Sequence, residues 1–80
     1  MSLTAQGQET LAELRRHRFH DLPLRLAVLR TALELAEFSP KAPTLQAVTL
    51  RLQERRHVPI SEDAIPRWWL SNWSDFFALH

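Results

Sequence analysis

The sequence has no cysteine, and its only glycine and only lysine are Gly7 and Lys41. The absence of cysteine excludes disulfides and thiolate metal sites and is consistent with a reducing cytosol. Tight hairpins of the Asn-Gly or Gly-X kind are excluded after position 7, which counts against a sheet. No apolar stretch approaches the roughly 20 residues that cross a bilayer, and Met1 to Thr10 lacks the pattern of a signal peptide. We therefore expect a cytoplasmic helical protein without membrane association.

The composition predicts one globular domain spanning residues 1–80. Hydrophobic residues make up 45% of the chain, and ten Lys plus Arg are nearly balanced by nine Asp plus Glu. The resulting net charge of +1 argues against a strong nonspecific attraction to nucleic acid. Because a core of this size supplies little stability, we expect a partner or a second copy of the chain, most simply in a homodimer, to add to it.

The spacing of apolar residues predicts an all-α bundle of about four helices. The first is expected from about Gln8 to Arg18. The second should begin with Asp21 as its cap and Pro23 in its first turn. Its apolar arc makes it the central helix of the core, and the main stripe contains Leu22, Leu26, Leu29, Leu33 and Ala36.

Two further helices are expected in the second half of the chain. Thr44 should open the third, which ends in the cluster from Gln53 to His57. Ser61 is a strong candidate to cap the fourth, which should run to the end of the chain. Pro66 removes a hydrogen bond and restricts the preceding residue, so this helix either starts near Pro66 or has a distorted first turn.

The segment from Ile60 to Trp69 reads Ile-Ser-Glu-Asp-Ala-Ile-Pro-Arg-Trp-Trp. An aliphatic residue, a Ser cap, variable positions, a second aliphatic residue and an Arg-Trp pair follow one another. Over about Thr44 to Trp73 the chain resembles bacterial helix-turn-helix transcriptional regulators. The resemblance implies a DNA-binding regulator whose third helix crosses the phosphate backbone and whose fourth enters the groove.

The DNA-contacting residues that this resemblance implies are Arg51, Arg55, Arg56, Glu62, Asp63 and Arg67. The arginines would contact phosphates, whereas Glu62, Asp63 and Pro66 would lie near the bases. Acidic residues at the start of such a helix repel phosphate. The alternative interpretation is that Ser61, Glu62 and Asp63 form only the N-cap of an ordinary bundle helix.

The segment from Trp68 to His80 holds all three tryptophans and two of the four phenylalanines. Core filling accounts for most of these rings. One face of a bundle helix cannot hide all of them, so the remainder indicates a surface for a protein partner. The residues predicted for this interface are Trp68, Trp69, Trp73, Phe76 and Phe77.

Two arginine-rich segments, Leu14 to His20 and Arg51 to His57, predict either solvated helix faces or surfaces that bind acidic groups or phosphate. His17, His20 and Asp21 lie close in sequence, but no third firm metal ligand follows at helical spacing, so no metal site is predicted. No catalytic grouping, phosphate loop or cofactor motif is present. We therefore expect a non-enzymatic, cofactor-free binding protein. It is either a helix-turn-helix DNA-binding regulator or a small adaptor or inhibitor that docks on a protein through its aromatic C-terminal helix.

Overall fold

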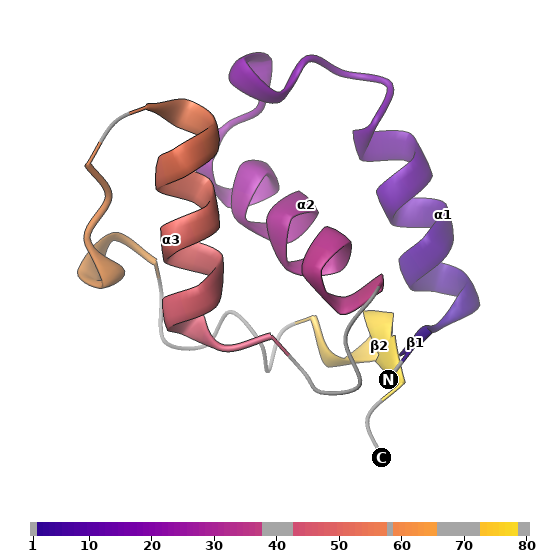
Figure 1. The fold of residues 1–80 in the computed structure, drawn as a ribbon. Coiled ribbons are helices and arrows are strands. Elements are labelled where there is room, and N and C mark those ends of the chain that lie inside the picture. Colours follow the sequence, from indigo (N-terminus) through magenta and orange to yellow (C-terminus); the bar gives the residue numbers. More distant parts are fainter. Residues whose placement is uncertain (1, 38–42, 58, 66–72, 79–80) are drawn as a thin grey trace.

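A computed structural model describes residues 2–37, 43–57, 59–65 and 73–78. Within these residues the fold is mainly helical, with α1 (Ala5–Leu14), α2 (Leu24–Glu37) and α3 (Leu45–Arg56). Figure 1 shows α2 between the other two helices, which pack against its two sides. The all-α class is confirmed, with three α-helices in the described part of the chain instead of about four.

The central helix α2 buries a broad arc of its surface, as its sequence predicts. The buried positions are Ala27, Val28, Leu29, Thr31, Ala32, Leu33 and Ala36. Two details differ from expectation. Leu26 is 37% exposed and lies outside the core. The helix begins directly after Pro23, whose carbonyl accepts from the amide of Ala27 at 2.9 Å, and Asp21 lies in a short 3₁₀ helix, Phe19–Asp21, instead of capping α2.

The outer helices begin at threonine caps. Thr4 Oγ1 accepts from the amide of Gly7, and Thr44 Oγ1 accepts from the amide of Ala47, both at 3.1 Å. The predicted start of the third helix at Thr44 is therefore confirmed. The first helix begins earlier than about Gln8 and ends at Leu14, short of Arg18, because the chain turns toward the 3₁₀ helix that carries Phe19 into the core.

The prediction of a fourth helix running to the chain end is wrong for the described residues. Ser61 acts as a cap, since its Oγ accepts from the amide of Asp63 at 3.1 Å, but only a 3₁₀ turn, Glu62–Ala64, follows. Ile65 precedes a proline, which disfavours helical backbone at that position. The final described residues form a further 3₁₀ turn, Ser74–Phe76, and a short strand, β2 (Phe77–Ala78). Residues 66–72 lie outside the description.

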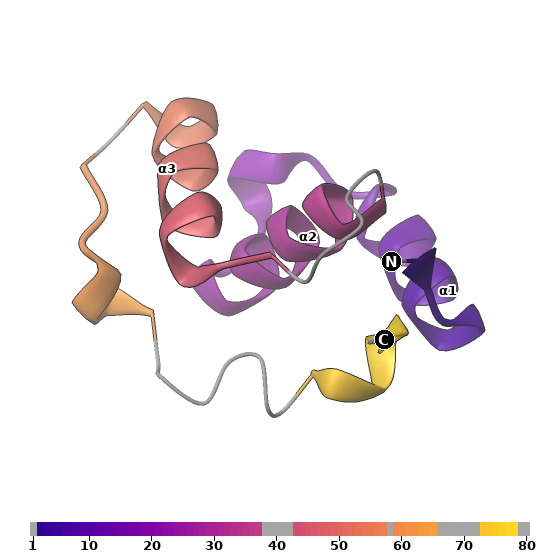
Figure 2. The ribbon, with the colours of Figure 1, turned by 60° about the horizontal axis from the view of Figure 1, so that its bottom comes forward.

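Two short strands, one near each end of the chain, pair in a small sheet. Strand β1 (Ser2–Leu3) pairs antiparallel with β2, with Ser2 opposite Ala78 and Leu3 opposite Phe77. Thr4 extends this contact by donating its amide to Phe76 O at 3.1 Å and its hydroxyl to Asp75 O at 2.7 Å. Figure 2 shows the C-terminal segment beside the start of α1. This sheet joins segments far apart in sequence, so the lack of hairpin glycines does not prevent it.

Candidate functional site

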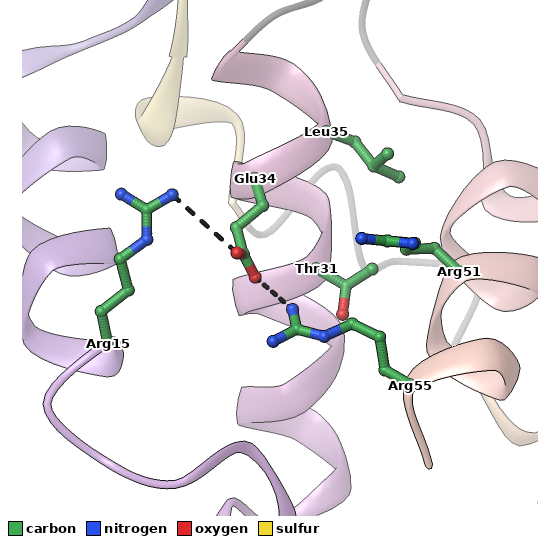
Figure 3. Close-up of a pocket in the computed structure, with 6 residues that line it drawn as sticks. All are labelled: Arg15, Thr31, Glu34, Leu35, Arg51 and Arg55. Atoms are coloured by element: carbon green, nitrogen blue, oxygen red, sulfur yellow. Dashed lines mark hydrogen bonds and ion pairs between the residues drawn. The ribbon is translucent and has the colours of Figure 1, made fainter. Parts of the chain in front are cut away.

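A pocket of about 410 Å³ lies over α2, between α3 and the residue that follows α1. It is lined by Arg15, Thr31, Glu34, Leu35, Arg51 and Arg55. Figure 3 shows the α2 side chains between Arg15, which follows α1, and the two arginines of α3. Three arginines face one glutamate, so the lining carries two net positive charges. A concave surface of this kind suits an anionic group.

Glu34 forms the centre of this charge cluster. Its carboxylate pairs with Arg55 Nη1, with Arg30 Nε at 3.4 Å and with Arg15 Nη2 at 3.8 Å. The Glu34 side chain is 27% exposed, so these pairs are only partly screened by water. One carboxylate offers about four acceptor sites, whereas three guanidinium groups offer many more donors. The cluster therefore has hydrogen-bond donors to spare for a second anion.

The arginines on the two sides of the pocket are more accessible than those beneath it. Arg15 and Arg51 have side chains that are 44% and 55% exposed, against 24% for Arg55. Each also has a surface partner, since Arg15 Nη2 lies 3.1 Å from Glu37 and Arg51 Nη1 lies 3.2 Å from Glu54. Exposed pairs of this kind exchange readily with other anions because each contributes little net stability.

The buried ring of Phe19 contacts several arginines of the cluster. Its ring is 8% exposed, and the guanidinium carbon of Arg55 lies 3.9 Å from the ring centroid. Arg30 and Arg56 lie over the same ring at 5.5 and 5.6 Å. Because an aromatic face attracts cations, it helps to hold several like charges close together. The 3₁₀ helix at Phe19–Asp21 therefore helps to position Arg30, Arg55 and Arg56.

Backbone carbonyls fix two of these arginines further. Arg30 Nη1 donates to His17 O at 3.0 Å and to Leu14 O at 3.3 Å. Arg56 Nη2 donates to Leu22 O. Both side chains thus tie a helix to the α1–α2 connection. This use leaves Arg15, Arg51 and Arg55 as the arginines that line the pocket.

Of the residues predicted to contact DNA, those that the structure describes lie on α3 and on the turn that follows it. Arg55 and Arg56 make the internal contacts described above, and Arg51 remains accessible on α3. Asp63 is exposed, and Glu62 begins the 3₁₀ turn after the Ser61 cap. Arg67 and Pro66 lie outside the described residues. A groove-entering helix is not seen in the part of the chain that the structure describes.

The structure describes three of the five residues predicted for the aromatic interface, and none of these three is exposed. Trp73 and Phe77 are 6% and 3% exposed and belong to the core, while Phe76 is partly buried against it. Trp68 and Trp69 lie outside the described residues. The exposed large apolar side chains among the described residues are instead those of Leu24, Leu26 and Leu50. Core filling is thus the role of the aromatic residues whose environment is known.

The described residues contain no group of three or more His, Cys, Asp or Glu that could hold a metal ion, so His17, His20 and Asp21 do not form such a site. No helix in the described residues is long and apolar enough to span a membrane. Comparisons with protein-family models, curated proteins and solved structures find no match.

Sequence reasoning did not single out the central residue of the site. Glu34 and Arg30 have the i, i+4 spacing of a helical ion pair, which could have indicated one of the contacts. The approach of Arg15 and Arg55 from two other helices has no local signal. The arginine-rich segments around both residues predict either solvated helix faces or anion-binding surfaces, and the pocket combines one arginine from the first segment with two from the second.

Proposed function

We propose that this chain is a small non-enzymatic binding protein that takes an acidic segment of a protein partner into the pocket over α2. The observation that carries the proposal is the convergence of Arg15, Arg51 and Arg55 on one hollow that contains a single carboxylate. Guanidinium groups bind carboxylates through paired hydrogen bonds, which are stronger than neutral ones. A carboxylate side chain of the partner would use the donors that Glu34 leaves free.

A single carboxylate fits the surroundings better than a nucleic acid backbone does. Glu37 and Glu54 pair with the accessible arginines Arg15 and Arg51, so negative charge flanks the pocket on both sides. A row of phosphates would meet these acids, whereas one acidic side chain would avoid them. The net charge of +1 also gives the chain little long-range attraction for DNA. These features favour the adaptor or inhibitor class.

A helix-turn-helix DNA-binding regulator is the second candidate. Two observations favour it: Ser61 caps the turn that follows α3, and Arg51 projects from α3 with 55% of its side chain exposed. In this alternative Arg51 contacts phosphate, together with Arg67. Such binding would weaken steeply as salt concentration rises, because each neutralised phosphate releases counterions.

Fluorescence anisotropy with two labelled probes separates the candidates. The purified chain is titrated with a short peptide of otherwise neutral sequence that carries a single glutamate and with duplex DNA, each at about 50 mM and about 200 mM salt. The peptide should bind, and Arg51→Ala should weaken this binding by about tenfold, the usual effect of losing one charge-assisted contact. Arg16→Ala is the matched control, because Arg16 is 77% exposed and pairs with Glu13 away from the pocket lining.

Each outcome has a distinct meaning. Peptide binding that depends on Arg51 but not on Arg16 supports the proposal. Equal losses of affinity in the two variants would show that the peptide is held by general charge attraction, which would contradict a binding site in the pocket. Binding of duplex DNA in preference to the peptide, with a steep salt dependence, would replace the proposal by the regulator.

A further inference from the structure

Glu34 is placed to control which anions the pocket accepts. It lines the pocket, and its carboxylate already pairs with Arg15 and Arg55, two of the three arginines that an incoming anion would contact. A ligand in the pocket therefore meets the favourable field of the arginines and the repulsion of a fixed negative charge at the same time. No other carboxylate is among the lining residues.

We infer that Glu34 is a specificity-determining residue that reduces the advantage which the positively charged pocket would otherwise give to doubly charged phosphate groups over singly charged carboxylates. The inference rests on the proposed function and adds the class of acid that is selected. Repulsion by Glu34 scales with the charge of the ligand, and a phosphorylated side chain carries about −1.5 to −2 at neutral pH. The penalty is thus nearly twice as large for a phosphoserine as for a glutamate.

The position of Glu34 makes the repulsion hard to relieve by moving the side chain away. Three guanidinium groups from different segments hold it, and Arg30 in turn is fastened to the carbonyls of Leu14 and His17. The carboxylate therefore stays in the pocket when a ligand arrives. Such a repulsive element is a usual means of discriminating against a related ligand.

The test compares two peptides of identical neutral sequence, one with a single central glutamate and one with a central phosphoserine. Their affinities are measured by anisotropy for the wild-type chain and for Glu34→Gln, which removes the charge and keeps the shape. Even with the full screening of bulk water, removing one charge at a distance of about 5 Å changes the affinity for the glutamate peptide by about fourfold and for the phosphoserine peptide by about tenfold, and weaker screening makes both changes larger. Both affinities should rise in the variant.

The ratio of the two affinities is the decisive quantity. Partial unfolding of the variant lowers both affinities equally and leaves their ratio unchanged. Glu13→Gln is the charge-matched control, because Glu13 is 66% exposed and pairs with Arg16 outside the pocket. It should leave the ratio at its wild-type value. An equal change for both peptides in Glu34→Gln would overturn the inference.

Two further outcomes keep this inference separate from the proposed function. If neither peptide binds the wild type or Glu34→Gln, the proposed function fails and the inference with it. If the glutamate peptide binds in an Arg51-dependent manner while the wild type binds phosphoserine more than about tenfold more tightly, the pocket is real and the inference alone is wrong. The wild-type comparison therefore decides the question even where circular dichroism shows that Glu34→Gln does not fold.

Discussion

Replacing Gly7 by alanine should improve helix propensity but create a steric clash, and the structure indicates that the clash has the larger effect on stability. Gly7 lies inside α1, where alanine is more favourable than glycine by up to about 1 kcal/mol. A Cβ at this position, however, would lie 2.3 Å from the carbonyl oxygen of Phe76 and 3.3 Å from Cβ of Leu3. The first distance is far below van der Waals contact, and the obstacle is backbone, so the C-terminal segment must move.

The cost can be worked out from the contacts of that segment. Moving the Phe76 carbonyl weakens its bond from the Thr4 amide and the neighbouring bond from Thr4 Oγ1 to Asp75 O, each worth about 1 kcal/mol. Partial loosening of the buried Trp73 and Phe77 adds about 1 to 2 kcal/mol. After subtracting the gain in helix propensity, Gly7→Ala should lower the free energy of unfolding by about 2 to 3 kcal/mol.

Urea denaturation followed by circular dichroism measures this effect. With a slope of about 1 kcal/mol per molar urea for a chain of this size, the midpoint should fall by about 2 to 3 M. Ala12→Gly, at an exposed position of the same helix, gives the propensity difference without the close contact and should cost about 1 kcal/mol. A Gly7→Ala variant that is as stable as the wild type, or more stable, would refute the close approach of the two chain ends.

Two other substitutions test the supports of the fold and pocket. Phe19→Leu keeps most of the buried volume but removes the aromatic face that Arg55 contacts. The free energy of unfolding, measured by urea denaturation, should therefore fall by about 1 to 2 kcal/mol. An unchanged value would show that the cation–π contact does not contribute to stability. His57 caps the C-terminal end of α3 in the left-handed conformation, with φ of 57° and ψ of 32°, which glycine adopts more easily. His57→Gly should therefore stabilise the chain by up to about 1 kcal/mol in thermal unfolding. A loss of stability would show that the His57 side chain contributes more than its backbone conformation costs.

The helices that could be predicted from the sequence are those whose start and apolar period agree. Thr44 is a good cap directly before a regular apolar pattern, and α3 begins after it. The apolar arc of α2 is wide because two helices pack on it, which is why its central position was predictable. The last part of the chain has a good cap at Ser61 but a proline shortly after Ile65. The local cap was predicted correctly, whereas the described residues after it, up to Ile65, form a 3₁₀ turn instead of the start of an α-helix.

The pairing of β1 with β2 could not be predicted, because neither segment carries a local sequence pattern typical of a strand. Ser2 and Leu3 are a polar and an apolar residue in a short N-terminal segment, and their strand exists only because Phe77 and Ala78 lie alongside. The lone glycine was the available signal. A glycine within a helical segment costs stability unless something approaches it closely, and here the Phe76 carbonyl does.

The arginines show that residue type alone indicates what a side chain can bind and does not indicate what it contacts in the fold. Arg55 and Arg56 have the chemistry for phosphate contacts, but both guanidinium groups lie over the Phe19 ring, and Arg56 also donates to the Leu22 carbonyl. Grouping these charges requires a counter-charge, which Glu34 supplies to Arg55. The same carboxylate then limits how much negative charge a ligand can bring into the pocket. Structural support and ligand selection at this site are therefore consequences of one ion-pair cluster, and a substitution at Glu34 should alter both.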